Sequence, residues 1–69
     1  MLFTDVSSAR AQKAFEKVGF KVIRQGKHTV MSDGARYLTL PRRNPINPYT
    51  LRTLIRAAGL SDEQFKDLL

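Results

Sequence analysis

His28 is the only histidine in this sequence of 69 residues, and it comes directly after Gly26 and Lys27. Imidazole is the side chain best suited to proton transfer near neutral pH. RNA carries its own nucleophile in the 2′-hydroxyl group. A base that removes this proton, together with cations that stabilise the negative charge at phosphorus, is therefore sufficient for strand cleavage. His28 is the candidate catalytic residue, and this chemistry requires no metal ion.

Cations and a polar residue near His28 are candidate ligands for RNA. Guanidinium groups suit this role because they donate paired hydrogen bonds to phosphate oxygens. The residues from which we expect RNA contacts are Arg24, Gln25, Lys27, Arg36, Arg42 and Arg43. Two questions stay open from the residues alone. A lone histidine is often a solvated surface residue, and one ring leaves the second proton transfer without an assigned group.

The formal net charge of the chain is +6, from 12 Lys and Arg residues against 6 Asp and Glu residues. The excess is concentrated in the middle of the sequence, where Asp33 is the only acidic residue between Glu16 and Asp62. A small surface with this charge attracts polyanions, which favours a nucleic-acid partner. A basic surface that only keeps the protein in solution is the alternative.

Other kinds of site find little support in the composition. Without cysteine the chain has no disulfide, no thiolate metal cluster and no cysteine nucleophile, and no second histidine can form a metal pair with His28. A glycine-rich phosphate loop is also missing. We therefore expect neither a cofactor nor a bound metal.

Tyr37 and Tyr49 are expected in the core or at its edge, with stacking on RNA bases as their alternative role.

The length favours one domain, residues 1–69, because a second core usually needs roughly 100 residues or more. A core in so short a chain rarely contributes more than about 3–5 kcal/mol, so a partner or an oligomer is expected. The N-terminal residues do not resemble a signal peptide, and no stretch approaches the ~18 apolar residues that span a membrane. We expect a cytoplasmic protein that does not contact membranes.

Periodicity and capping residues predict the helices. Apolar residues at helical spacing predict one helix within residues 7–18, capped by Asp5, Ser7 or Ser8, and a second from Pro48 to just before Gly59. The residues expected to pack are Ala11, Ala14, Phe15 and Val18 in the first helix and Leu51, Leu54, Ile55 and Ala58 in the second. A capping-box pattern that begins at Ser61 predicts a short terminal helix.

Between the helices, β-type segments at residues 20–25, 28–32 and 36–40 predict a meander of three strands. Gly26-Lys27 and Asp33-Gly34 separate the strands, and the glycine of each pair can supply the positive φ angle of a tight hairpin. The expected fold class is α+β, in the order helix, three antiparallel strands and helix, with the helices on one face of the sheet. This is the topology of a double-stranded-RNA-binding domain, which does not by itself establish function.

A series of short motifs makes the chain resemble a known family. The motifs are a helix that ends in Gly19-Phe20, the turn Gly26-Lys27-His28, Leu40-Pro41 after the third strand, and the helix TLRTLIRAAGLS at residues 50–61. In this order and at these separations, they cover nearly the whole chain and resemble the HicA toxin family.

The resemblance implies a fold like that of a double-stranded-RNA-binding domain and a catalytic histidine at the position of His28. It implies the function of an mRNA interferase, a metal-independent endoribonuclease that cleaves mRNA without the ribosome. It also implies neutralisation by a HicB antitoxin, and contact with DNA only through that antitoxin. A non-catalytic RNA-binding module of the same fold and a protein-interaction domain with a basic face are the alternatives.

Two positions depart from the family pattern. Lys27 stands where the family usually has Ser or Thr, and Arg42-Arg43 stand where many members have a second histidine. The first change keeps a group that binds phosphate, and the second exchanges an accessory proton carrier for two guanidinium groups. We expect an altered rate or substrate preference, and a catalytically weakened toxin is the alternative.

Overall fold

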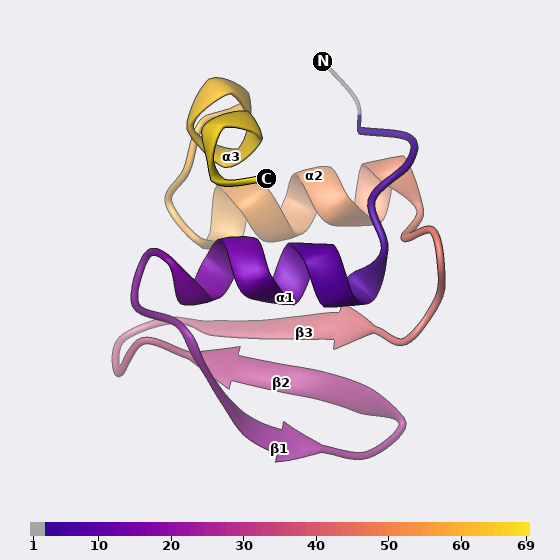
Figure 1. Ribbon diagram of the computed structural model, residues 1–69. Helices are drawn as coiled ribbons and strands as arrows, with labels where there is room; N and C mark the ends of the chain where they lie inside the picture. Colours follow the sequence, from indigo (N-terminus) through magenta and orange to yellow (C-terminus); the bar gives the residue numbers. More distant parts are fainter. Residues whose placement is uncertain (1–2) are drawn as a thin grey trace.

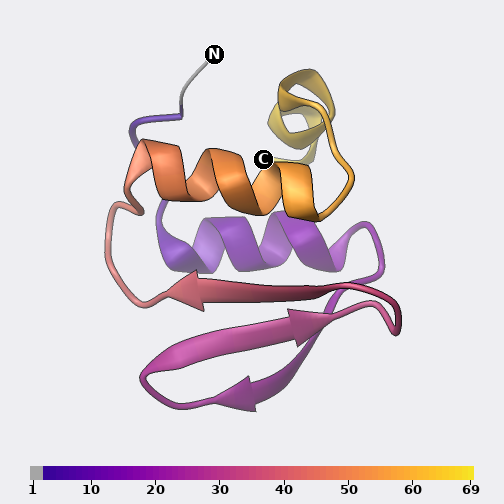
Figure 2. The same cartoon turned by 180° about the vertical axis from the view of Figure 1, so that it is seen from behind.

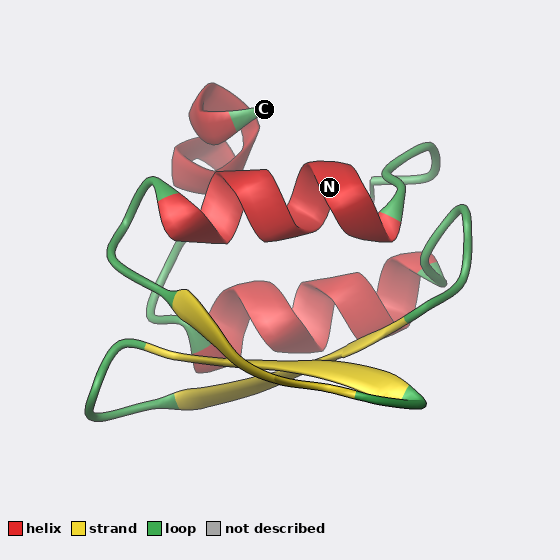
Figure 3. Cartoon of the chain, turned by 60° about the horizontal axis from the view of Figure 1, so that its bottom comes forward, coloured by secondary structure: helices red, strands yellow, loops and turns green. Residues whose placement is uncertain are grey.

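The computed structural model describes residues 3–69, which fold into three helices and one antiparallel sheet (Figure 1). In chain order the elements are α1 (Ser8–Glu16), β1 (Lys21–Gln25), β2 (His28–Ser32), β3 (Tyr37–Pro41), α2 (Pro48–Ala57) and α3 (Asp62–Leu68). The helices lie on one side of the sheet (Figure 3). The predicted α+β fold is confirmed, including the order of its elements. None of the helices in residues 3–69 is long and apolar enough to cross a membrane.

β2 is the central strand, paired antiparallel with β1 on one side and with β3 on the other. At one end of the β2–β3 ladder His28 lies opposite Pro41, and at the other end Ser32 lies opposite Tyr37. Side chains alternate between the two faces of a strand, so these four residues share a face. It is the face away from the helices, because the alternate position Met31 is fully buried in the core.

The register of β1 changes at a bulge. Val22 pairs with the buried Met31, and the next pair is Arg24 with Val30, which makes Ile23 the extra residue. Ile23 is 57% exposed on the face away from the helices. The sequence pattern of this strand does not reveal the bulge.

Side-chain caps define where the helices begin. Ser7 is the N-cap of α1, and its Oγ accepts a hydrogen bond of 3.2 Å from the backbone N–H of Arg10. Asn47 caps α2, and the predicted capping box at Ser61 opens α3. Of the three candidate caps for the first helix, the structure selects Ser7.

The buried apolar side chains of residues 3–69 form a cluster between the helices and the sheet. Its largest fully buried members are Phe15, Phe20, Phe65, Met31, Leu38, Leu40, Ile46, Leu51 and Ile55. The residues predicted to pack belong to this cluster, with the exception of Val18, which is 38% exposed. That prediction is wrong because α1 ends at Glu16, and Gly19, with a φ of 100°, reverses the chain before another helical turn can form.

The two tyrosines are also not core residues. Tyr37 is 69% exposed and Tyr49 is 68% exposed, so their predicted burial is wrong. In β3 the inward positions belong to the buried Leu38 and Leu40, which leaves Tyr37 on the opposite face. Tyr49 lies in the first turn of α2, outside the buried stripe of that helix.

The two hairpin connections differ in length. Gly26-Lys27 joins β1 to β2 as predicted, although Gly26 does not take the expected positive φ. The second connection spans residues 33–36, one residue more than the predicted strands leave between them, so β3 begins and ends one residue later than expected. The Asp33 carboxylate explains the shift, because it accepts the backbone N–H groups of Ala35 (2.9 Å) and Arg36 (2.7 Å) and so keeps both residues in the turn.

Contacts with distant residues tie the segment before α1 to the rest of the chain. The backbone N–H of Ile46 donates to the carbonyl of Val6 at 2.9 Å, and the ring of Phe3 packs edge-on against that of Phe65, with centroids 5.3 Å apart. These contacts hold the segment beside the helices, as the view from behind also shows (Figure 2).

Candidate functional site

His28 lies on the outer face of the sheet, the face away from the helices. The residues of this face are Lys21, Ile23, Arg24, His28, Val30, Ser32, Tyr37, Thr39 and Pro41. His28 is the first residue of β2, and its side chain is exposed. No acidic residue occurs within β1, β2 or β3, so the charges on this face are positive. The geometry therefore presents the imidazole to solvent in cationic surroundings.

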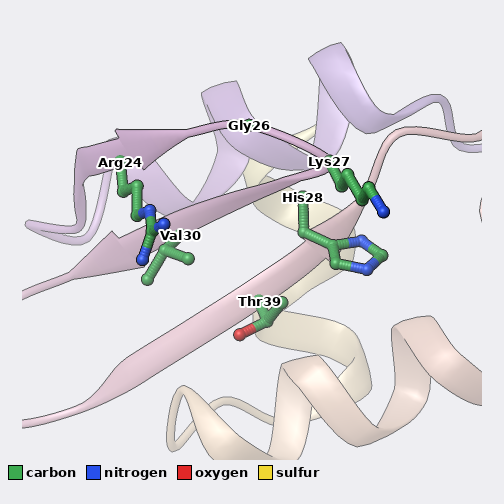
Figure 4. Close-up of a pocket in the computed structure, with 6 residues that line it drawn as sticks. All are labelled: Arg24, Gly26, Lys27, His28, Val30 and Thr39. Atoms are coloured by element: carbon green, nitrogen blue, oxygen red, sulfur yellow. The ribbon is translucent and has the colours of Figure 1, made fainter.

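A hollow of about 440 Å³ lies beside His28 (Figure 4). It is lined by Arg24, Gly26, Lys27, His28, Val30 and Thr39. In Figure 4 the side chains of Arg24, His28 and Thr39 project from the same side of the strands. The volume is within the range of small-molecule sites, roughly 300–1,000 Å³. Residues that carry an imidazole, a guanidinium and an ammonium group thus line an open hollow large enough for a phosphate and part of its nucleotide.

Arg42 restrains the turn that carries His28. Its Nη1 donates a hydrogen bond of 2.9 Å to the carbonyl oxygen of Gly26, and the N–H of Gly26 donates to the carbonyl of His28 at 3.2 Å. Arg42 follows directly after Pro41, the ladder partner of His28. A hydrogen bond with a charged donor is stronger than a neutral one. The contact therefore links the segment after β3 to the turn and fixes the backbone on which the imidazole stands.

The structure brings only part of the predicted RNA-binding set to His28. The members that line the hollow or contact its turn are Arg24, Lys27 and Arg42. Gln25 pairs with the buried Thr29, so its side chain leaves β1 on the face opposite to Arg24. Arg43 is exposed in the loop that follows β3.

Arg36 lies at the other end of the sheet. It precedes Tyr37, whose partner Ser32 is four residues from His28 along β2, a separation of roughly 13 Å. The Arg36 guanidinium lies against Gly59, the second residue after the end of α2. If Gly59 carried a Cβ atom, that atom would be 3.2 Å from the Cζ atom of Arg36. A cation is favourable at a helix C-terminus. The position of Arg36 thus suits the packing of the fold, and the structure does not bring it to His28.

Carboxylates do not contribute to the hollow. Asp33 stands in the β2–β3 turn, where the backbone N–H groups of Arg36 and Ala35 donate to its carboxylate and lower its pKa. The ionised carboxylate acts there as a cap of the turn. Within residues 3–69, no three His, Cys, Asp or Glu side chains gather closely enough to hold a metal ion.

Sequence reasoning missed the apolar part of the outer face. Ile23 and Tyr37 are both more than half exposed, on the two edge strands. A signal for the tyrosine was present in β3. Tyr37 and Thr39 alternate with two leucines, which places the leucines inward and the other two residues on the same face as His28. No such signal marks Ile23, because its exposure depends on the bulge.

Comparison with known families identifies the chain. A family model described as the HicA toxin of bacterial toxin-antitoxin systems matches residues 8–60. The chain belongs to the HicA toxin family. The matched residues run from the start of α1 to just beyond α2 and include every residue that lines the hollow. HicA membership supports the role of a toxin and implies pairing with an antitoxin. Searches of curated proteins and of solved structures give no match.

The two departures from the HicA pattern lie on either side of the histidine. Lys27 precedes His28 and is one of the residues that line the hollow, so its positive charge lies close to the imidazole. Arg42, the first of the two arginines at the second departure, donates a hydrogen bond to the turn that carries His28. One guanidinium nitrogen of Arg42 thus donates a hydrogen bond to the backbone of the turn. This residue therefore has a structural role in addition to its positive charge.

Proposed function

We propose that this HicA toxin is an mRNA interferase, a metal-independent endoribonuclease in which His28 carries out the catalytic proton transfer. The observation that carries the proposal is the position of His28, an exposed imidazole at a hollow that Arg24 and Lys27 also line. RNase activity is general among HicA toxins, and a polyanionic substrate suits a chain with a net charge of +6.

In this mechanism the neutral imidazole of His28 removes the proton of a 2′-hydroxyl group, and the 2′-oxygen attacks the adjacent phosphorus. The bond between phosphorus and the 5′-oxygen of the next nucleotide breaks. The products are a 2′,3′-cyclic phosphate and a 5′-hydroxyl group. Arg24 and Lys27 stabilise the charge that develops on the phosphoryl oxygens. The leaving 5′-oxygen takes its proton from water or from the Lys27 ammonium group, since the chain has no second imidazole.

We also propose that a HicB-type antitoxin neutralises the toxin by covering the hollow. The cations on the outer face of the sheet suit an acidic surface of such a partner, because complementary potentials speed and orient association. The antitoxin and the RNA would then compete for the same groups, and the pair would contact DNA only through the antitoxin.

The decisive experiment is cleavage of a transcribed mRNA by the purified protein in the presence of EDTA. A general base contributes roughly 10²- to 10⁴-fold to a rate, so His28→Ala is expected to cleave at least about 100-fold more slowly. Lys66→Ala, which removes an exposed cation from α3, is the control and is expected to cleave normally. Equal rates for His28→Ala and the wild type would show that His28 is not the catalytic residue. Tight, salt-sensitive RNA binding without any cleavage would instead indicate an RNA-binding module.

Expression in growing cells tests the toxin role and the partner. We expect growth arrest with the wild-type chain and none with His28→Ala at equal protein levels. Co-expression of the adjacent open reading frame should restore growth if it encodes the antitoxin. Arrest by both proteins would mean that toxicity does not depend on the imidazole.

A further inference from the structure

The outer face of the sheet continues beyond the hollow and ends at an exposed aromatic ring. Val30 and Thr39 form a cross-strand pair in the lining of the hollow, and the next pair on the same face is Ser32 with Tyr37. The surface from His28 to the tyrosine is therefore continuous along the β2–β3 ladder, over roughly 13 Å.

Tyr37 is the most exposed of the large hydrophobic residues on this face. Its exposed fraction is 69%, and that of Ile23 on the other edge strand is 57%. Both lie on a sheet whose helices all cover the opposite side (Figure 3). In RNA-recognition domains an open antiparallel sheet presents aromatic rings in this way, and unpaired bases stack on them. The geometry of Tyr37 is that of a stacking platform.

Positive charge accompanies the ring. Ser32 on β2 pairs with Lys21 on one side and with Tyr37 on the other. One cross-strand row therefore holds an ammonium group on β1 and the tyrosine ring on β3. The next row places Arg24 near the hollow, and none of the three strands contains a carboxylate. Binding of single-stranded nucleic acid combines these two elements, a stacking platform for bases and a cationic track for the phosphates.

The groups on the outer face favour a single strand of RNA as its occupant beyond the hollow. The exposed ring of Tyr37 offers a surface on which a base can stack, and the cations of β1 lie in the same cross-strand rows, with no carboxylate in the three strands. A single strand of RNA needs only the ring and the row of cations.

We propose that the outer face from His28 to Tyr37 is a track for single-stranded RNA, in which Tyr37 stacks on a base of the strand that is cleaved at His28. This inference rests on the proposed function and adds to it the form of the substrate. Tyr37 is too far from the imidazole to touch the reacting atoms, so it acts as a positioning residue. Duplex RNA is a poor ligand for the track, because its bases are already stacked and paired.

Binding to a cleavage-deficient protein tests the track directly. In the His28→Ala background, a labelled single-stranded oligoribonucleotide of about ten nucleotides is titrated with protein, within the site sizes known for such surfaces. Tyr37→Ala is expected to raise Kd about 5- to 100-fold, the range for loss of one stacked base. Tyr37→Phe keeps the ring and should bind like its parent. The matched control is Tyr49→Ala, which removes an equally exposed tyrosine from α2 and should leave Kd unchanged.

The same variants with His28 intact separate this inference from the proposed function. Tyr37→Ala is expected to raise KM for single-stranded RNA with little change in kcat, and to melt at the wild-type temperature. RNA binding that depends on Tyr37 without any cleavage supports the track and contradicts the catalytic proposal. Cleavage and binding by Tyr37→Ala at wild-type levels overturn the track and leave the catalytic proposal intact. If Tyr37→Ala binds RNA normally but binds the antitoxin more weakly, the track is also overturned, because the tyrosine ring then belongs to a protein interface.

Discussion

The two turns of the sheet each involve an arginine, and the two arginines are used differently. At the β1–β2 turn, Arg42 binds the carbonyl of Gly26 from outside the hairpin, while other cations remain free to line the hollow beside His28. At the β2–β3 turn, Arg36 lies over Gly59 and its backbone N–H is bound by Asp33. Positive charge is available to a ligand at the first turn, and it serves packing at the second.

This contrast shows why a count of nearby cations does not define a binding site. Arg24 and Arg36 are equally plausible phosphate ligands in the sequence, since each lies within a few residues of a strand end. Their surroundings in the fold separate them. Substitutions at the two turns test this contrast.

Arg42→Ala should damage function more than stability. Loss of its hydrogen bond frees the turn that carries His28, and misplacement of a catalytic group by about 1 Å can cost up to about 100-fold in rate. We expect kcat for RNA cleavage to fall about 10- to 100-fold, with little change in KM or in Tm. Arg36→Ala serves as the control and should cleave within about twofold of the wild type while its Tm falls. A rise in KM without a fall in kcat would instead make Arg42 a phosphate ligand.

Gly59→Ala should destabilise the protein at the second turn. A φ of 79° costs a residue with a Cβ about 1–2 kcal/mol, and the new atom would also press on the Arg36 guanidinium at 3.2 Å. A Cβ atom added at Gly26 would have no neighbour within 4 Å, and Gly26 does not have a positive φ. The free energy of unfolding of Gly26→Ala should therefore stay within about 0.5 kcal/mol of the wild-type value. Urea denaturation measures both. Equal losses in the two variants would contradict the difference between the turns.

Lys27→Ala should change the salt dependence of RNA binding. Each phosphate contact with a single strand contributes about 0.7 to the slope of log K against the logarithm of salt concentration, so removal of this ammonium group should lower the slope by about that amount. Arg36→Ala should leave the slope unchanged if its guanidinium serves packing. Titrations at several salt concentrations distinguish the two. A lower slope for Arg36→Ala would assign that residue to the binding surface after all.

Asp33→Ala should have the smallest effect, visible mainly in its dependence on pH. The backbone N–H groups of Arg36 and Ala35 lower the pKa of the Asp33 carboxyl in the folded state. Its contribution to stability is therefore present above the pKa of the unfolded chain and is lost as the pH falls through the lower pKa of the folded state. We expect a slightly reduced Tm at neutral pH and no difference from the wild type in strong acid. A difference of equal size at both pH values would point to a cause other than ionisation.

Sequence patterns predicted those features of the fold that depend on neighbours along the chain. The packed stripes of α1 and α2, the start of α2 at Pro48, the capping box at Ser61 and the three-stranded meander all follow from spacing within a few residues. The position of His28 at an exposed strand start beside a short turn was also predictable, because Gly26 and the β-type residues after it mark the hairpin.

What the patterns missed depends on contacts between distant residues. Arg42 and Gly26 are 16 residues apart, and the contact of Arg36 with Gly59 joins a hairpin to a helix end. Neither is visible in local periodicity. The bulge at Ile23 is a property of two strands together, since it is defined by the register with β2. For this reason the composition of the candidate site was only partly predictable.

Contacts close to both ends of the described chain determine how the protein can be handled. Phe3 packs on Phe65 of α3, and the carbonyl of Leu68 accepts a hydrogen bond of 2.8 Å from the Nζ of Lys17 after α1. Both ends therefore leave the fold on the helix side, away from the outer face of the sheet (Figure 1). An affinity tag or a fluorescent domain fused at either end would emerge there. Attachment to a sensor surface through such a tag leaves the sheet facing the solution, so RNA and antitoxin can be measured as competing ligands on one tethered molecule.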